Sequence, residues 1–264
     1  MSECAYCKRE STATREHVIP AFLYNFQRKL DESIIGWNEV AKKMVGGEHK
    51  IKDVCADCNN EKLSALDAYG KGFLTPSGFL CHNYSKLSAD LSYDYDLLVR
   101  WLLKISFNSS RTDKAHSPLL ERFIPYILDG VHPPCRRDLA VVAALAAPTN
   151  ISQLKGEYPP LESVAGASGR INPFFVRIAY GPNHYKSFTL RIVMFGPLIF
   201  FMLVFLPGVL PGHASIEIKR FLKNLPKGVE IHRNRKRAYI DVGTTTWLDY
   251  YTPQVLRVKS LKHS

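Results

Sequence analysis

Apolar and polar positions follow a helical period in the middle of the chain. In 92–108, SYDYDLLVRWLLKISFN, the apolar side chains recur at helical spacing and predict an amphipathic helix. These side chains are Leu97, Leu98, Trp101, Leu102 and Ile105. A shorter apolar run over 119–128 follows Pro118 and predicts another helix. The segment 73–135 is therefore expected to be helical.

From about residue 139 onward, the apolar positions form short runs of β type. Five runs predict strands, over 139–146, 173–180, 188–195, 198–205 and 238–242. The stretch 159–169, PPLESVAGASG, predicts a loop. We therefore expect a β-rich region over 136–264.

The uncharged stretch 192–213 needs separate consideration, because about 20 apolar residues suffice to span a bilayer. A Gly-Pro pair lies near its start, and two Pro-Gly pairs interrupt its end. We interpret it as two buried strands and expect no membrane association.

Residues 1–72 contain two C-x-x-C pairs, Cys4 with Cys7 and Cys55 with Cys58. Zinc takes four thiolate ligands at tetrahedral corners, and each C-x-x-C turn supplies two of them. The pairs predict one structural zinc site, and four unrelated buried thiols are the alternative. The remaining cysteines, Cys81 and Cys135, are interpreted as ordinary buried thiols.

A short amphipathic helix is predicted directly after the second cysteine pair. In 59–71, Leu63, Leu66 and Tyr69 share one helical face, and Gly70 and Gly72 mark the expected end.

Composition and charge narrow the class of protein and its partners. Of the 264 residues, 46% are hydrophobic and 22% charged, which excludes disordered, collagen-like and coiled-coil chains. The formal net charge is +11, and 136–264 holds 18 basic and 7 acidic residues, against 10 and 11 in 1–70. This surplus favours an anionic partner, with nucleic acid first and a membrane surface second. The N-terminus has no apolar stretch typical of a signal peptide, so we expect a cytoplasmic protein with reduced thiols.

Two further motifs accompany the cysteine pairs. REHVIP (15–20) lies between them, and NNEK (59–62) follows the second. An acid-His pair followed by x-x-Pro, bracketed by C-x-x-C pairs and followed by Asn and a helix, resembles the HNH endonucleases of the ββα-metal superfamily. The zinc-bracketed form is similar to the phage Holliday-junction resolvase endonuclease VII. The resemblance covers residues 1–70.

The resemblance implies a role for each matching residue. Glu16, where the family usually has Asp, and Asn59 would bind a catalytic divalent cation, Mg²⁺ or Mn²⁺. His17 would be the general base. The family often has a further Asn before the second cysteine pair that orients the catalytic loop. The sequence KIKDV (50–54) has none, and His49 and Asp53 are the candidates to replace it.

Phosphodiester hydrolysis requires these residue types independently of the resemblance. A neutral imidazole deprotonates water near neutral pH, and a hard cation on oxygen ligands stabilises the leaving oxygen. Each candidate also has a structural alternative. His17 would be exposed or hydrogen-bonded, Asn59 would be a helix N-cap, and Lys62 would face solvent instead of a phosphate.

A basic segment, Lys219–Arg237, contains eight Lys or Arg and one Glu. Neutralising phosphates gives sequence-independent binding through counterion release. We expect nucleic-acid contacts from Lys62 and from a basic quartet, which is Arg233, Arg235, Lys236 and Arg237. A solvated charged hairpin is the alternative.

We therefore predict an α+β protein with a zinc-bound ββα-metal (HNH) module at 1–72, a helical segment at 73–135 and a basic β-rich region at 136–264. The leading hypothesis is a metal-dependent HNH endonuclease that hydrolyses DNA phosphodiester bonds. The second is a non-catalytic, zinc-dependent nucleic-acid-binding protein. The third is a structural interaction protein whose basic half docks an acidic partner.

Overall fold

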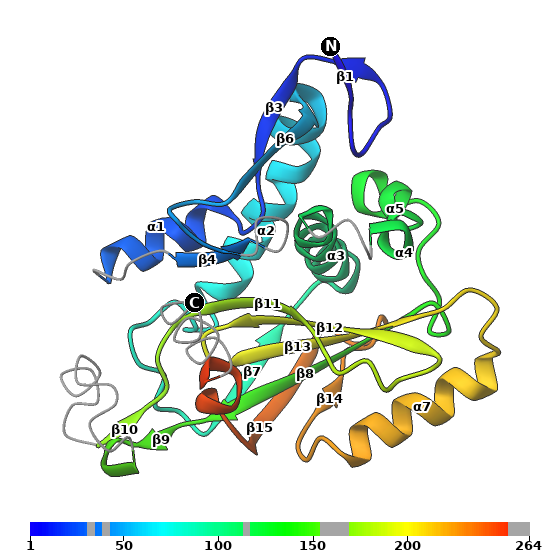
Figure 1. Cartoon of the computed structure of the whole chain (residues 1–264). Helices are drawn as coiled ribbons and strands as arrows, with labels where there is room; N and C mark the ends of the chain where they lie inside the picture. The colour runs from blue at the N-terminus through cyan, green and yellow to red at the C-terminus, as the bar shows by residue number, and fades with distance from the viewer. Residues whose placement is uncertain (31–34, 39–42, 113–116, 154–168, 253–264) are drawn as a thin grey trace.

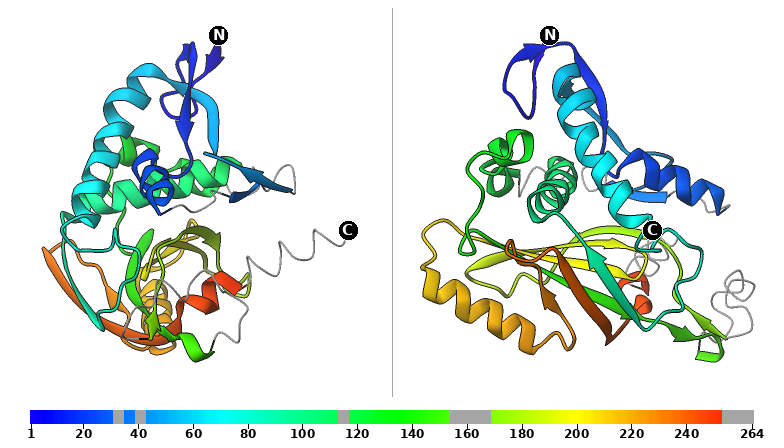
Figure 2. Two further views of the ribbon diagram at one scale, coloured as in Figure 1. Left: turned by 90° about the vertical axis from the view of Figure 1, so that its left-hand side faces the viewer. Right: turned by 180° about the vertical axis from the view of Figure 1, so that it is seen from behind.

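The computed structural model describes residues 1–30, 35–38, 43–112, 117–153 and 169–252. Figure 1 shows a tapered N-terminal part above a β-sheet, with the long helix α3 (Tyr95–Arg111) between them. Helix α7 (Pro211–Lys223) lies on the other side of the sheet. The view from behind in Figure 2 shows the same order of layers. The sheet is therefore covered on both faces.

The N-terminal part is centred on one antiparallel pair of strands. Strand β3 (Ala13–His17) pairs with β6 (Lys50–Cys55), and the register shifts between Thr14 and Arg15. A π-helical turn, η1 (Cys58–Leu63), follows β6 and continues as α2 (Ser64–Leu74). The other elements of this part are β1 (Ser2–Glu3), β2 (Glu10–Ser11), α1 (Ala21–Lys29), β4 (Ile35–Asn38) and β5 (Lys43–Gly46).

A seven-stranded sheet organises the C-terminal region, with the order β11-β12-β13-β8-β15-β7, and β14 also pairs with β8. Its strands are β7 (Ser88–Ser92), β8 (Leu139–Ala147), β11 (Val176–Tyr180), β12 (Phe188–Phe195), β13 (Leu198–Phe205), β14 (Val229–Glu230) and β15 (Arg237–Thr246). Smaller elements nearby are β9 (Thr149–Asn150), η2 (Ile151–Gln153) and β10 (Arg170–Ile171).

Strands β8 and β13 are apolar throughout because both faces of the sheet are buried. Side chains alternate between the two faces along a strand. One set, including Val141 and Phe200, packs in the core shared with the N-terminal part, and the other, including Val142 and Phe201, packs in the core that contains α7. Double burial therefore explains the uninterrupted apolar runs.

Helix α3 contacts both parts of the molecule. Its first turn is capped by Asp94, whose side chain accepts a hydrogen bond from the backbone N–H of Leu97 at 3.0 Å. The ring of Trp101 stacks on Phe195 of the sheet at 4.8 Å between centroids. On the other side, a Cβ at Gly70 would lie 2.1 Å from Cε2 of Trp101, so only glycine permits this approach of α2 to α3.

Several elements match the sequence predictions. Strands β12 and β13 have the expected bounds, and β8, β11 and β15 overlap the other three predicted strands. The helix expected over 92–108 is α3. The stretch 192–213 is formed mostly by β12 and β13, as predicted. None of the helices in the described ranges has the length and apolar character needed to traverse a bilayer.

Other expectations are wrong in part. The segment 73–135 is not only helical, because β7 joins the sheet beside β15. The helix expected over 119–128 is two short helices, α4 (Ser117–Glu121) and α5 (Ile124–Asp129), and α2 continues beyond Gly70. Cys135 is exposed and Cys81 is half-buried, so neither is a fully buried thiol. The predicted loop lies, except for Gly169, outside the described residues.

Candidate functional site

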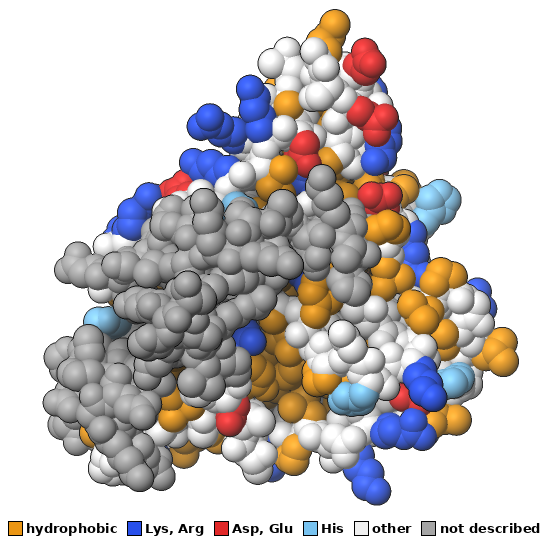
Figure 3. All heavy atoms as spheres, in the orientation of Figure 1, with side chains coloured by type: hydrophobic (Ala, Val, Ile, Leu, Met, Phe, Trp, Pro, Cys, Tyr) orange, Lys and Arg blue, Asp and Glu red, His pale blue; other side chains and the backbone are white. Residues whose placement is uncertain are grey.

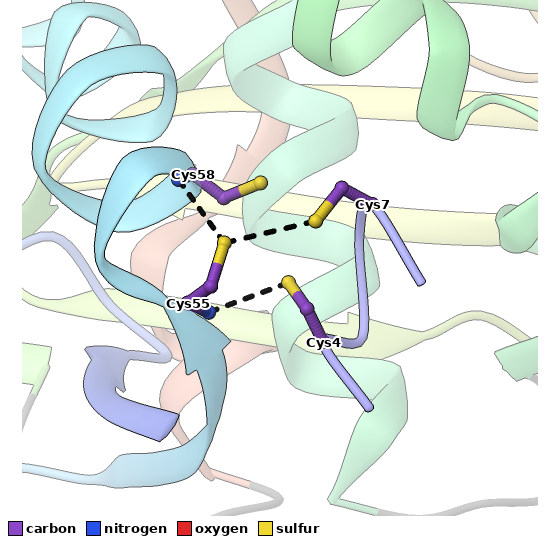
Figure 4. A group of neighbouring side chains, drawn as sticks. All are labelled: Cys4, Cys7, Cys55 and Cys58. Carbon is purple, nitrogen blue, oxygen red and sulfur yellow. Dashed lines mark hydrogen bonds between the residues drawn. The ribbon is translucent and has the colours of Figure 1, made fainter. Parts of the chain in front are cut away.

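The four cysteines of the two C-x-x-C pairs lie together at the base of η1. Their sulfur atoms are all within 4.8 Å of one another, and Cys7 Sγ is 3.7 Å from Cys55 Sγ (Figure 4). Ligand sulfurs 2.3 Å from a tetrahedral zinc ion are about 3.8 Å apart, so the cluster has the size and donor set of a zinc site. The sequence prediction that these cysteines come together is confirmed, and they can hold one zinc ion.

Local structure gives the cysteine cluster unequal protonation properties. Burial acts against ionisation of Cys7, but hydrogen bonds from Arg9 outweigh it and lower the pKa of the thiol to about 6. Burial raises the pKa of the Cys58 thiol. Arg9 also forms an ion pair with Asp57 at 3.1 Å, which joins the two C-x-x-C turns. Metal binding requires thiolates. Of these two thiols, Cys7 therefore forms its thiolate more readily than Cys58.

A pocket of about 400 Å³ lies beside the β3–β6 pair. The three residues for which the resemblance implied catalysis, Glu16, His17 and Asn59, all line it. They come from the end of β3 and from η1, and Asp67 and Lys71 of α2 complete its polar lining together with Asn60 and Ser64. The fold thus gathers the predicted site residues into one open cavity.

His17 is held by a carboxylate that the sequence analysis did not select. Its Nε2 is 2.8 Å from Oε2 of Glu48. The same carboxylate contacts Lys50 Nζ at 2.8 Å and Arg28 Nη2 at 2.6 Å. Hydrogen bonds from Lys50 and His17 lower the pKa of Glu48 to about 2, so the group is ionised and fixes the orientation of the imidazole.

The two residues proposed as substitutes for the missing Asn make contacts of their own. Asp53 forms an ion pair with Arg111 of α3. His49 accepts a hydrogen bond at its carbonyl oxygen from the N–H of Val18. The carboxylate in contact with the His17 imidazole is that of Glu48.

Glu16 is nearly inaccessible, with 5% of its side chain exposed, and is paired with a buried lysine. The side chain of Lys104 is 1% exposed. Its Nζ lies 2.8 Å from Oε1 of Glu16 and 2.6 Å from Oδ2 of Asp67. Burial alone would lower the pKa of Lys104, but the two carboxylates outweigh it and raise the pKa, so the ammonium stays charged. The Lys104 ammonium therefore shares one buried cluster with two carboxyl groups, and burial raises the pKa of Asp67.

Helix α3 supplies further support for the site. Asn108, four residues after Lys104, donates from Nδ2 to Oε1 of Glu16 and to the carbonyl oxygen of His17, both at 2.9 Å. Its Oδ1 accepts from the hydroxyl of Tyr6 at 2.6 Å. Trp101 donates from Nε1 to Asp67 at 3.2 Å. Positions at helical spacing on α3 thus hold the side chains that line the pocket.

Asn59 is tied to β3 and is not the N-cap of η1. Its Nδ2 donates to Oγ1 of Thr14 at 2.9 Å and to the carbonyl oxygen of Arg15 at 3.2 Å. The N-cap position is occupied by Asp57, which makes no capping hydrogen bond through its side chain. The amide nitrogen of Asn59 is thus used structurally, while Oδ1 remains as its possible cation ligand.

Two side chains that line the pocket each have an oxygen atom outside their hydrogen bonds. Within the described residues, both contacts of the Glu16 carboxylate go to Oε1, and those of the Asn59 amide go to Nδ2. Glu16 Oε2 and Asn59 Oδ1 are the type of ligand that Mg²⁺ and Mn²⁺ take in proteins. The positive charge of Lys104, whose Nζ lies 2.8 Å from Oε1 of Glu16, weakens such a site.

The predicted nucleic-acid contacts lie elsewhere and are mostly paired with acids. Lys62 forms an ion pair with Asp129 of α5 at 2.5 Å. In the basic quartet, Arg233 pairs with Asp96 at 2.9 Å and Arg237 pairs with Asp90. Lys62 and the quartet are absent from the described lining of the pocket.

Sequence reasoning missed Glu48, Lys104 and Asn108. Lys104 and Asn108 are polar positions on an amphipathic helix, and no local signal distinguishes them from solvent-facing residues. Comparison of the chain with models of protein families, with curated proteins and with solved structures returned no match.

Proposed function

We propose that the protein is a metal-dependent endonuclease of HNH type that hydrolyses phosphodiester bonds in DNA. One observation carries the proposal: Glu16, His17 and Asn59 line one open pocket. The order of strand, strand and helix around it, with the cysteine cluster at the helix start, is the arrangement expected of a ββα-metal module.

In this proposal, His17 removes the proton from the attacking water. When Nε2 donates its hydrogen to Glu48, Nδ1 carries the lone pair that accepts this proton. Glu48 then stabilises the imidazolium that forms, because its own charge is retained at neutral pH. The hydrogen bond from Asn108 to the carbonyl oxygen of His17 holds the backbone of the base in place.

Glu16 and Asn59 would hold the divalent cation, Mg²⁺ or Mn²⁺, through Oε2 and Oδ1. When bound, the cation supplies charge stabilisation at the leaving oxygen. Lys104 and Asn108 of α3 hold the Glu16 carboxylate in place through its Oε1 atom. The cysteine cluster, with zinc, fixes the start of η1 and hence Asn59, the residue after Cys58.

A non-catalytic, zinc-dependent nucleic-acid-binding protein is the second candidate. The observation that favours it is the ion pair between Lys104 and Glu16, because a lysine already neutralises the carboxylate that would bind the cation. The two candidates differ in whether the protein cuts DNA at all.

Cleavage by a His17→Ala variant tests the proposed function. Supercoiled, linear and branched DNA, and RNA, are incubated with wild type and variant in Mg²⁺ or Mn²⁺. Loss of a positioned base should lower the cutting rate by about 10²- to 10⁴-fold. His213→Ala, at an exposed position on α7, is the matched control and should cut at the wild-type rate.

Two variants then separate the base from the cation ligands. Glu16→Gln and Asn59→Ala should be partly rescued by raised Mg²⁺ or Mn²⁺, whereas His17→Ala should not. Wild-type cutting by a His17→Ala protein with an unchanged thermal melt would place the base elsewhere. DNA binding without cutting by the wild type would favour the second candidate.

A further inference from the structure

The β3–β6 pair presents a positively charged surface around His17. After the register shift, Arg15 lies opposite Lys52, and His17 lies opposite Lys50. Because side chains alternate along a strand, these four share one side of the pair, and Glu16 points to the other. Arg15, Lys50 and Lys52 are exposed.

Helix α1 extends this surface through Arg28, which reaches Glu48 at 2.6 Å. The basic face is defined here as Arg15, Arg28, Lys50 and Lys52. Within the described ranges, Glu48 is the one carboxylate that contacts these cations, through Arg28 and Lys50. Figure 3 shows Lys and Arg side chains gathered at the upper left, over the strand pair and towards α1.

Arg15 and Lys52 lie opposite each other on the strand pair, and their repulsion lowers its stability. Like charges at directly opposed positions of an antiparallel pair destabilise the sheet. In the ranges that the structure describes, neither Arg15 nor Lys52 forms an ion pair, whereas Arg233 and Arg237 do. The fold thus neutralises much of the C-terminal basic segment and leaves the strand cations without a counter-charge, which a bound anion would supply.

The position of the basic face selects the kind of anion. His17, which lines the pocket, lies in the same row of side chains as Arg15. Spaced cations along an extended strand suit a chain of phosphates better than a single small anion. Cations of this kind position a phosphate backbone without reading its bases.

We propose that the basic face binds the phosphate backbone of nucleic acid and directs it to the pocket beside His17. The inference deepens the proposed function, on which it rests for the identity of the anion. It assigns backbone binding to the N-terminal part, although residues 1–70 hold 10 basic and 11 acidic side chains.

Binding of a fluorescently labelled DNA duplex by the zinc-loaded full chain tests this inference. The measurement uses no added divalent cation, with intact DNA verified on a gel, and covers a series of salt concentrations. Arg15→Gln/Lys52→Gln should weaken binding by about tenfold and reduce the log–log salt slope by about two. Its thermal midpoint should equal or exceed that of the wild type, because a repulsion is removed.

Arg137→Gln/Lys186→Gln is the matched control, since it removes the same charge from exposed positions outside the site, the basic face and the basic segment. It should change affinity less than twofold. Equal losses in the two double variants would mean a general effect of net charge and would overturn the inference, as would unchanged binding by Arg15→Gln/Lys52→Gln. Dependence on Arg15 and Lys52 for anionic vesicles but not for DNA would also overturn it.

The cutting assay is separate from this binding measurement. A wild type that binds through the basic face and cuts no nucleic acid would refute the proposed nuclease while the basic face stands. If Arg15→Gln/Lys52→Gln cuts and binds DNA as the wild type does, the basic face is refuted and the proposed nuclease stands.

Discussion

The N-terminal part and the C-terminal sheet are stabilised by different means. The sheet buries apolar side chains on both faces, and β8 and β13 have no polar residue. The N-terminal part instead buries Glu16 against Lys104 and Asn108 of α3 and gathers four cysteines. Polar groups are costly to bury unless every one is paired. The candidate site therefore lies where the fold buries several charged and polar side chains together.

The two parts also differ in how their charges are arranged. The C-terminal half holds the whole surplus of basic residues, but Arg136, Arg233 and Arg237 form ion pairs. The N-terminal part is almost neutral, yet Arg15, Lys50 and Lys52 lie on one face of the β3–β6 pair, and acids such as Glu16 and Asp53 pair with α3. Charge counted along the sequence therefore does not locate the charged surface.

The largest expected effect comes from the cysteine cluster. The purified protein should hold one zinc per chain by elemental analysis, and Cys58→Ser should lose it. Structural zinc contributes about 10 kcal/mol or more to folding of small modules, so hydrogen exchange should become fast in β3, β6 and α2. Exchange in β8 and β13 should stay slow if the two parts are stabilised independently.

Two controls accompany the zinc measurement. Cys81→Ser, outside the cluster, should retain zinc and protection. Leu203→Ala, fully buried in β13, should destabilise the sheet by about 2–5 kcal/mol and retain zinc. A folded, reduced protein without zinc, or joint unfolding of both parts in Cys58→Ser, would break the comparison.

A second effect is expected from the buried charge cluster. Lys104→Met should lower the free energy of unfolding by about 3–5 kcal/mol, because Glu16 and Asp67 would be left without their shared cation. Denaturant unfolding measures this change. Lys104→Met/Asp67→Asn should recover part of the loss. Lys71→Met, at an exposed position on the same pocket, should change stability by less than about 0.5 kcal/mol.

The smallest expected effect concerns Glu48 and pH. Its pKa is lowered to about 2 in the folded protein from the ordinary 4.5, so its ion pairs stabilise fully above pH 4.5 and lose this effect as the pH falls towards 2. Glu48→Gln should be less stable than the wild type at pH 7 by about 1 kcal/mol, since solvent screens a partly exposed network. Thermal melts of the two proteins should converge on acidification. If the difference between the two thermal midpoints stays constant as the pH falls, the charge of the Glu48 carboxylate does not stabilise the fold.

Local patterns in the sequence predicted those features that depend on local physics. The largely apolar runs over 188–195 and 198–205 predicted the bounds of β12 and β13, and the spacing of Leu98, Trp101 and Leu102 predicted α3. The two C-x-x-C pairs predicted the cysteine cluster because each pair is set by one tight turn. The HNH assignment and its catalytic roles stay predictions.

The remaining features depend on pairings between distant segments. Glu16 and Asn108 are 92 residues apart, and His17 and Glu48 are 31 apart. The β3–β6 pair was missed because its strands are short and polar, without the alternation that marks a half-buried strand. Helix α7 was missed because its Pro and Gly residues were interpreted only as breaks, although Pro is well tolerated in the first turn of a helix.

Helix α3 sets a limit on how this site can be transplanted. A fusion that carried only residues 1–74 to another protein would include Glu16, His17, Asn59 and the cysteines. It would lack the ammonium of Lys104 and the amide of Asn108, which hold Glu16 from behind. The smallest portable unit of the site therefore extends at least through Arg111, the last residue of α3, whose other side belongs to the sheet. In recombination or in design, a segment that transfers the site must therefore include α3 as well as residues 1–74.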